Sequence, residues 1–378
     1  MVYLDYAATT PMSKESIEAY NTAAISYYGN ANSLHTIGTQ AGDLLSLCRH
    51  KLASFINGDT QGIHFTSGGT ESNMLAIQSL LQRTEHRGKH IITTSLEHAS
   101  VLRALSSSQK VGYTITYLPV NKAGVVSIEA LKQAIQEDTV LVAIQHVNHE
   151  LGSIQPIQAI GQLLKEHGIW FHCDCVQSFG KIPIDVEKAS IDSLSVASHK
   201  LYGPKGVGFV YIRPASGKSI SNLINLVTEH DRGTMNVPGI VAFATAAEHA
   251  HNQLKKSYNH FENLKSYLLT QIEGLQGFVQ MEANSPAHFP GIIGLTFRNV
   301  QGQYVMLQCN RHNIAVATGS ACTVHKQAPL RSLLAIGKSP EQAKNFIRIS
   351  FSLHTTTEDL DELMKVLHLL HKEIMKER

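Results

Sequence analysis

Through the first two thirds of the chain, short β-branched apolar runs alternate with longer segments whose apolar residues recur at helical spacing. Several runs are apolar at successive positions, which is typical of strands buried between two helix layers. Many spacers are long enough for a crossover helix. The pattern therefore predicts an α/β fold with a mostly parallel, seven-stranded sheet. The predicted strands are Ile63–Thr66, His90–Thr94, Tyr113–Leu118, Val140–Gln145, Trp170–Cys173, Ser193–Val196 and Gly208–Ile212.

The pattern changes near the end of this region. Only residues 199–206 join the last two predicted strands, too little chain for a parallel crossover, so we expect one antiparallel pair there. After Pro238 a long helical stretch runs to about Ile272 and precedes two further apolar strands, Ile292–Phe297 and Ile347–Phe351. We expect a large domain over residues 12–250 and a small α+β domain made of 1–11 and 251–378.

The chain is predicted to close with a helix. Thr356 and Asp359 have the spacing of a capping box at its start. The apolar residues that follow at helical spacing are Leu360, Leu363, Met364, Leu367 and Ile374.

Composition and charge exclude several classes of protein. Of 378 residues, 43% are hydrophobic and 16% are charged, and this composition is typical of a globular protein. The formal charge of +2 is too small for a nucleic-acid-binding surface, so we expect no DNA partner. No apolar run reaches the roughly 18 residues that span a membrane, and the N-terminal segment lacks the pattern of a signal peptide. These features predict a soluble, cytoplasmic protein without membrane association.

The five cysteines are widely scattered, unlike a disulfide framework. Cys173 and Cys175, with His167 and His172 nearby, raise the alternative of a metal site. A closed zinc site usually pairs two Cys or His clusters, and no second cluster is evident, so we expect no metal.

Gly68-Gly69-Thr70 follows a predicted strand and opens a predicted helix whose apolar face is Met74, Ile77 and Leu81. Glycines allow close approach of an anion, and a helix N-terminus offers unpaired N–H groups with a favourable dipole. This segment is a candidate phosphate site, and an ordinary glycine turn capped by Thr70 is the alternative.

Two charged residues are expected at the same edge of the sheet. Asp174 follows the strand Trp170–Cys173, and Lys200 follows the next predicted strand. A phosphate site, a buried acid and a lysine at one rim are what pyridoxal phosphate (PLP) requires. Taken singly, Asp174 is equally compatible with a capped loop, and Lys200 with a solvated surface position.

Gly319-Ser320-Ala321-Cys322 forms a loop of small residues in the predicted small domain. A cysteine there is exposed, as a nucleophile must be, although free cysteines are more often buried small hydrophobes.

These segments resemble the NifS/IscS-like cysteine desulfurases, class V members of the fold-type I PLP enzymes. The likeness covers essentially the whole chain and is closest to the Bacillus-type NifS proteins, which also carry Asp-Cys-Val-Gln at the position of residues 174–177. The matching segments are Tyr3–Pro11, Thr66–Asn73, Glu97–His98, Asp174–Gln177, Ser198–Gly206, Gly319–Cys322 and Arg348–Ser350.

The resemblance assigns the cofactor ring to four residues. It implies that Lys200 holds PLP covalently, that Asp174 contacts the ring nitrogen and Gln177 the phenolic oxygen, and that His98 stacks on the ring and serves as acid and base.

The resemblance also assigns the phosphate and the substrate. The phosphate would be held by Gly69, Thr70 and His199, with Thr234 reaching it from the other subunit of a homodimer. Arg348 would bind the carboxylate of L-cysteine, a task suited to its two-pronged donors. Cys322 would take the substrate sulfur as a persulfide.

The chain departs from the family pattern at three places. His149 stands where the family has an asparagine that faces the ring. Ala197 replaces a phosphate-binding serine, which leaves one fewer hydroxyl unless Ser198 compensates. The segment 229–234 is short by a few residues, which weakens the assignment of Thr234.

The sequence thus predicts a homodimeric PLP enzyme that converts L-cysteine to L-alanine and passes sulfur from Cys322 to an acceptor protein, either an iron–sulfur scaffold or a dedicated apoenzyme. Alternatives are a selenocysteine lyase, another fold-type I enzyme such as an aminotransferase, and a non-catalytic scaffold of the same fold. An aminotransferase needs no thiol at the position of Cys322.

Overall fold

The computed structural model describes residues 1–84, 87–214, 233–319 and 329–376. The predicted nucleophile, Cys322, lies outside these residues.

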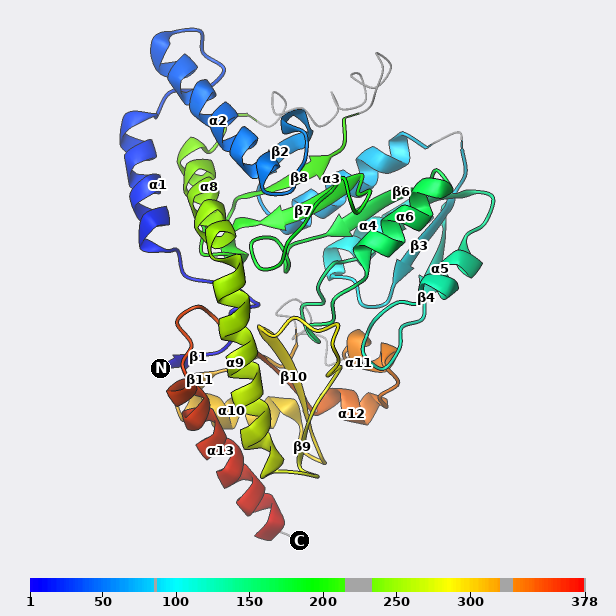
Figure 1. The fold of residues 1–378 in the computed structure, drawn as a ribbon, viewed down its shortest axis with the longest axis vertical. Helices are drawn as coiled ribbons and strands as arrows, with labels where there is room; N and C mark the ends of the chain where they lie inside the picture. Colours follow the sequence, from blue (N-terminus) through cyan, green and yellow to red (C-terminus); the bar gives the residue numbers. More distant parts are fainter. Residues whose placement is uncertain (85–86, 215–232, 320–328, 377–378) are drawn as a thin grey trace.

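A seven-stranded sheet forms the centre of the larger part of the molecule (Figure 1). Its order is β2-β8-β7-β6-β5-β3-β4. The strands are β2 (Ile63–Thr66), β3 (His90–Thr94), β4 (Thr114–Leu118), β5 (Thr139–Ala143), β6 (Trp170–Asp174), β7 (Ser193–Ala197) and β8 (Gly208–Ile212). All seven predicted strands are present, with ends shifted by at most two residues.

The pairing is parallel from β4 through β7. Strand β8 runs antiparallel to β7, which confirms the pair expected from the short connection. Strand β8 is also antiparallel to β2, which the sequence pattern did not predict. The sheet is mostly parallel, as predicted.

Helices cover both faces of this sheet. Neighbouring residues of one strand enter different cores, because side chains alternate between faces: Ile91 packs against α3 and α4, whereas Ile92 joins the core under α2, α6 and α8. The helices of this region are α1 (Lys14–Ser26), α2 (Thr36–Ser54), α3 (Gly69–Gln82), α4 (Ala99–Gln109), α5 (Ile128–Ala134), α6 (Ile157–Glu166) and α8 (Val237–Asn252), with short 3-10 turns η1 (Thr60–Gly62) and η2 (Ser198–Lys200).

The long helical stretch expected after Pro238 is present and is divided into two helices. Helix α8 ends at Asn252, and α9 (Leu254–Glu273) begins after Gln253, whose φ of −109° and ψ of 6° lie outside helical values. Figure 1 shows the pair as a column that runs from the large sheet to the lower part of the molecule.

The lower part of the molecule is built on a three-stranded antiparallel sheet of order β12-β10-β9. Strand β1 at the N-terminus pairs in parallel with β11, so the first residues of the chain join this part. Its elements are β1 (Val2–Tyr3), β9 (Val279–Met281), β10 (Ile292–Phe297), α10 (Gly302–Arg311), β11 (Ile314–Ala315), α11 (Arg331–Ala335), α12 (Pro340–Lys344), β12 (Phe346–Ser350) and α13 (Thr357–Lys376).

The predicted capping box at the start of α13 is present. The Asp359 carboxylate accepts from the Thr356 N–H at 3.0 Å, and the Thr356 hydroxyl accepts from the Asp359 N–H at 3.4 Å. Of the predicted apolar face, four residues are buried and Ile374 is partly buried.

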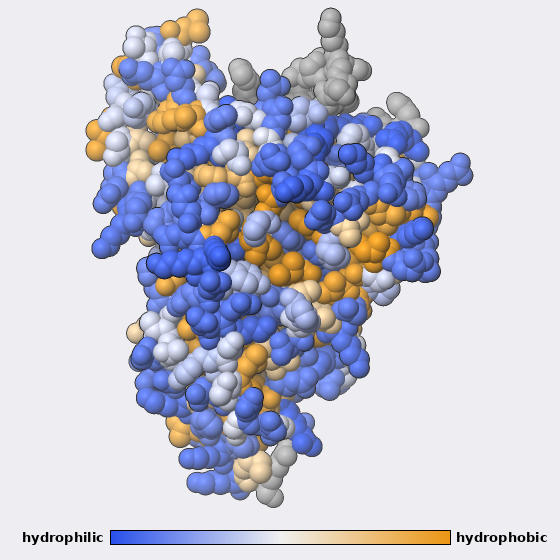
Figure 2. Space-filling view, in the orientation of Figure 1, coloured by the Kyte–Doolittle hydropathy of each residue, from blue (hydrophilic) through white to orange (hydrophobic). Residues whose placement is uncertain are grey.

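No helix within the described residues is long and apolar enough to cross a membrane. Hydrophobic surface gathers over α1 and α2 at the upper left of Figure 2. The exposed apolar side chains on these helices and the segment between them include Ile17, Ile25, Leu34 and Leu47.

Candidate active site

A cavity of about 230 Å³ lies beyond the carboxyl ends of β6 and β7, where open α/β sheets place their ligands. Ten of the predicted site residues line it: Gly69, Thr70, His98, His149, Asp174, Gln177, Ala197, His199, Lys200 and Arg348. The other lining residues are Ala7, Ala8, Asn73, Gln145, Val147 and Val176.

Asp174 is the last residue of β6 and is 6% exposed. One carboxylate oxygen accepts from the Asn73 side-chain amide at 2.8 Å, and the other accepts from the Val176 N–H at 3.0 Å. Both donors stabilise the ionised carboxylate in this buried place.

Lys200 is the last residue of the turn η2, and its side chain points toward the N-terminal segment of the chain. Its ammonium donates to the carbonyls of Ala7 at 2.5 Å and Ala8 at 2.7 Å. Gln177 donates to the same Ala7 carbonyl at 2.9 Å. These two carbonyls hold the Lys200 nitrogen at the cavity, where it could join the aldehyde of a bound cofactor.

A second lysine lies behind Gln177. The Lys181 ammonium donates to the Gln177 side-chain carbonyl at 3.0 Å. Burial, followed by the positive charges of Lys200 and Arg348, lowers the pKa of Lys181 to about 7. Deprotonation of Lys181 therefore begins near neutral pH, which limits the positive charge around Lys200.

The glycine segment forms the expected cradle at the start of α3. Gly68 has a φ of +143°, which favours glycine, and Gly69 is the first helical residue. A Cβ on Gly69 would come within 2.7 Å of the Val176 side chain, so this close approach requires glycine. The predicted apolar face of α3 is wrong at Met74, which is 43% exposed.

His199 lies on the same side of the cavity. Its Nδ1 is 3.1 Å from the Thr9 hydroxyl. Burial, then the charge of neighbouring Lys200, lowers the pKa of His199 to about 4, so the ring is neutral at physiological pH.

His98 and His149 form one wall of the cavity. Their rings meet edge to face, with centroids 5.5 Å apart and an interplanar angle of 76°. Burial lowers the pKa of His98 and holds the pKa of His149 well below its usual range. Two neutral imidazoles therefore face the space that a ring would occupy.

Arg348 comes from β12 and is 2% exposed. One Nη donates to Asp5 at 2.6 Å and the other to the His149 carbonyl at 2.8 Å. Its Nε is buried without a hydrogen-bond partner within the described residues. Because a guanidinium has five N–H donors, Arg348 retains donors for a carboxylate.

Two predicted positions, Ser198 and Thr234, do not line this cavity. The Ser198 hydroxyl is fully buried and packs against the backbone of Gly203, where an added Cβ would lie only 2.0 Å from the hydroxyl oxygen. Ser198 therefore does not supply the hydroxyl that is missing at Ala197. Thr234 is exposed and does not line the cavity of its own chain.

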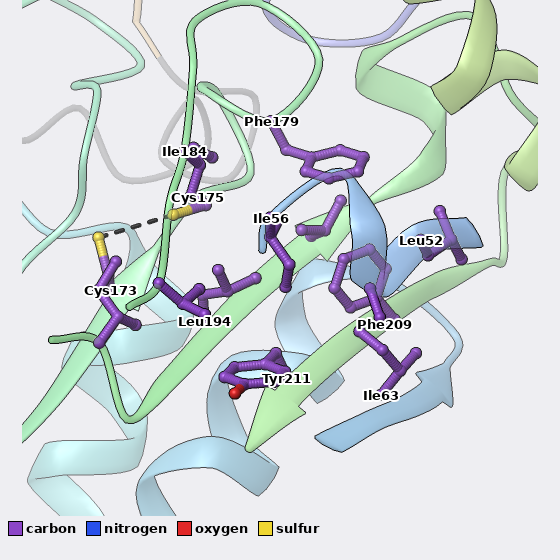
Figure 3. Close-up of a cluster of buried hydrophobic side chains, with 14 of the residues drawn as sticks. Leu52, Ile56, Ile63, Cys173, Cys175, Phe179, Ile184, Leu194, Phe209 and Tyr211 are labelled. Carbon is purple, nitrogen blue, oxygen red and sulfur yellow. Dashed lines mark hydrogen bonds between the residues drawn. The ribbon is translucent and has the colours of Figure 1, made fainter. Parts of the chain in front are cut away.

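The other cysteines near the site belong to the core. Cys173 and Cys175 are fully buried with their sulfur atoms 3.6 Å apart, and Figure 3 shows them beside Ile184 and Leu194. Within the described ranges, no three His, Cys, Asp or Glu side chains gather as metal ligands.

Sequence reasoning missed the residues that support this site. Asn73 binds Asp174, yet it appears in the sequence only as a polar residue within the segment that resembles the family. Its position in the sequence could have indicated this role, because Asn73 lies one helical turn after Gly69 and both residues face the same side of α3. The contacts from Ala7 and Asp5 carry no comparable signal, because they depend on how the N-terminus crosses the cavity.

The comparisons with known proteins agree with this geometry. The family model described as "Aminotransferase class-V" matches residues 2–363. The chain belongs to the class-V aminotransferase family. This confirms the family, and the fold-type I architecture, expected from the sequence.

Similar relatives include NifS- and IscS-like proteins. The chain is 44% identical to "Putative cysteine desulfurase NifS" of Bacillus subtilis, over 98% of this chain and 94% of the relative. It is 39% identical to "Cysteine desulfurase IscS" of Dictyoglomus turgidum, over 97% and 93%. A solved "NIFS-LIKE PROTEIN" superposes with a TM-score of 0.87 at 32% identity, covering 98% of this chain and 99% of the other.

The donor set fits PLP, the cofactor that this family implies. A lysine, a hydrogen-bonded carboxylate at a strand end and a glycine cradle at a helix N-terminus supply an amine, a partner for the ring nitrogen and an anion site. The cavity lies between these three features, so each could contact a different part of the same molecule.

Proposed function

We propose that this protein is a PLP-dependent cysteine desulfurase that converts L-cysteine to L-alanine and leaves the sulfur as a persulfide on Cys322. The observation that carries the proposal is that one cavity gathers Lys200, Asp174 and the Gly69 cradle with the buried guanidinium of Arg348. The relatives named as cysteine desulfurases support the same activity.

Bound PLP supplies an aldehyde that joins an amine and a ring that withdraws electrons from the bonds beside it. Lys200 would hold the aldehyde carbon and Asp174 the ring nitrogen. Gln177, whose amide already points at the Ala7 carbonyl, would hold the phenolic oxygen. The N–H groups at Gly69 and Thr70, together with His199, would hold the phosphate.

The remaining groups act on the substrate. Arg348 would fix the L-cysteine carboxylate, because its charge is buried and only partly engaged by Asp5. The amine of Lys200, once displaced by the substrate amine, accepts the Cα proton at Nζ. His98 lies beside His149 on one wall of the cavity and would contact the substrate sulfur.

The substrate sulfur would be transferred to Cys322. An S–S bond forms between the Cys322 thiolate and the substrate sulfur as the substrate C–S bond breaks, and the carbon skeleton becomes alanine. The persulfide then passes to an acceptor protein, an iron–sulfur scaffold or a dedicated apoenzyme.

The active unit would be a homodimer. The apolar side chains on α1 and before α2 support this, since Leu34 is fully exposed in the single chain. Thr234 would reach the phosphate site of the partner from its exposed position.

The test is an assay of the purified, PLP-loaded chain with L-cysteine. We expect alanine and, without a reductant, a persulfide that mass spectrometry locates on Cys322. L-selenocysteine in a parallel reaction measures the preference between the two substrates. A loaded protein that makes no alanine from L-cysteine would contradict the proposal.

A further inference from the structure

The ring of His98 is held from behind by its own helix. His98 is the residue before α4, and its Nδ1 accepts from the backbone N–H of Ser100 at 3.2 Å. The hydroxyl of Ser100 is also 2.7 Å from Nδ1. A backbone N–H can only donate, so Nδ1 carries no proton, and the neutral ring has its proton on Nε2.

A second residue, Asn73, completes the hydrogen bonds of the Ser100 hydroxyl. The amide nitrogen of Asn73 donates one hydrogen to Asp174 at 2.8 Å and the other to the Ser100 oxygen at 2.9 Å. Because Nδ1 of His98 already accepts from the Ser100 N–H and carries no proton, the Ser100 hydroxyl donates to Nδ1 while its oxygen accepts from Asn73.

The orientation of the Asn73 amide is itself determined. Its oxygen is 3.0 Å from Nε2 of His172, whose Nδ1 is 2.8 Å from the Ser193 hydroxyl. A neutral His172 that donates from Nε2 and accepts at Nδ1 satisfies both contacts. Burial lowers the pKa of His172 to about 4, which keeps it neutral.

Water does not compete with this chain of hydrogen bonds. Asn73 and Ser100 are each 1% exposed, and His172 and Ser193 are fully buried. A proton on Nδ1 of His98 could donate to the Ser100 hydroxyl, but it would also face the Ser100 N–H, which would be left buried without an acceptor. Such a buried unsatisfied group costs about 1–3 kcal/mol.

We propose that Asn73 and Ser100 are positioning residues that lock His98 with its proton on Nε2, so that His98 donates a hydrogen bond to the substrate's sulfur anion and does not remove the thiol proton. The thiol proton leaves to solvent, and Nε2–H then donates to the thiolate. The identity of the acceptor rests on the proposed desulfurase function, whereas the position of the proton rests on the hydrogen bonds alone.

The proton can be located directly. In the full-length, PLP-loaded chain with ¹⁵N-labelled histidine, we expect long-range ¹H–¹⁵N spectra at neutral pH to show His98 as the Nε2–H tautomer. The His98 signals are assigned as those missing from His98→Gln. A His98 signal with the proton on Nδ1, or a doubly protonated ring, would overturn the proposal.

Variants test the role of Ser100 in turnover. Ser100→Ala should lower kcat for alanine formation about threefold to tenfold, the effect of one hydrogen bond, with little change in KM. Ser100→Thr keeps the hydroxyl and should restore most of the rate. Ser107→Ala is the control, because Ser107 lies on the same helix with its hydroxyl on the Arg103 carbonyl.

The outcomes separate the two proposals. Equal rates in Ser100→Ala and the wild type would refute the positioning role of the Ser100 hydroxyl, whereas the backbone N–H that Ala retains should keep the His98 proton on Nε2. If the wild type makes no alanine, the desulfurase function fails, while the tautomer of His98 is still read from the spectrum.

Discussion

Lys200 is the residue on which covalent attachment of the cofactor depends. Its ammonium is held on two carbonyls at the cavity, whereas Lys205 is exposed nearby. We predict that Lys200→Ala lacks the visible absorbance of lysine-bound PLP and that borohydride no longer fixes PLP to the chain. Lys205→Ala is the matched control and should keep both. Absorbance that is lost from Lys205→Ala and retained in Lys200→Ala would contradict the assignment.

Cys322 should be required for sulfur transfer and dispensable for cofactor binding. Cys48, Cys173, Cys175 and Cys309 are all buried, so none can meet a substrate in the cavity without local unfolding. We predict that Cys322→Ser binds PLP with wild-type absorbance and loses alanine production by at least about a hundredfold.

The control for this prediction is Cys309→Ser. Burial raises the pKa of Cys309 to about 12, so its thiol is unreactive, and the variant should keep the persulfide on Cys322. Persulfide found on Cys173 or Cys175 by mass spectrometry would show that the route of sulfur is different.

At the scale of elements, close contact between helix α6 and the loop before β7 depends on Gly161. A Cβ at this position would lie 1.7 Å from the Ala189 carbonyl oxygen. We predict that Gly161→Ala lowers the free energy of unfolding by about 1–3 kcal/mol through overpacking, measured as a lower urea midpoint with unchanged slope.

Gly274, at the end of α9, is the matched control. Its φ of −67° suits any residue, and a methyl group added there would lie 3.6 Å from its nearest neighbouring atom. Gly274→Ala should raise the free energy of unfolding by about 0.4–1 kcal/mol, because it restricts the unfolded chain. Equal midpoints for the two variants would refute the packing argument.

Element ends also have physical causes. The apolar pattern predicts that strand β5 reaches Gln145, but the strand ends at Ala143. The Gln145 N–H donates to the Glu97 carboxylate at 2.8 Å and not to a neighbouring strand, whereas the Ile144 and His146 N–H groups still donate to β6 carbonyls. Burial raises the pKa of Glu97 to about 8, so this acceptor is a largely neutral carboxyl below that pH. The cavity opens where β5 stops.

At the scale of the whole molecule, buried histidines make the fold sensitive to acid. Burial lowers the pKa of His172 to about 4 from its ordinary value of 6.5. Between these two values the unfolded chain takes up a proton that the folded chain does not. The free energy of unfolding should therefore fall as the pH falls through this window, by on the order of 3 kcal/mol from this group.

The variant His172→Gln isolates this contribution. Urea midpoints measured between about pH 7 and about pH 4.5 should fall less steeply for His172→Gln than for the wild type. His312→Gln, at an exposed position, should leave the wild-type dependence unchanged. Identical pH dependence in the wild type and His172→Gln would contradict the prediction.

The sequence by itself determined the sheet and the chemistry at its edge. Apolar runs marked the strands because most of them are buried on both faces, with the edge strand β4 partly exposed, and the strand ends placed Asp174 and Lys200 at one rim. These features are local in the chain, so spacing and residue type were sufficient. The antiparallel β7–β8 pair followed in the same way from a connection too short for a crossover.

Only the tertiary structure decided which groups support that chemistry. Asp5 meets Arg348 across 343 positions of sequence, and Asn73 meets Asp174 across 101. Such contacts depend on where the N-terminus crosses the cavity and on how α3 packs against β6. The side of His98 that carries its proton likewise follows from three buried donors and acceptors, and their directions exist only in the folded chain.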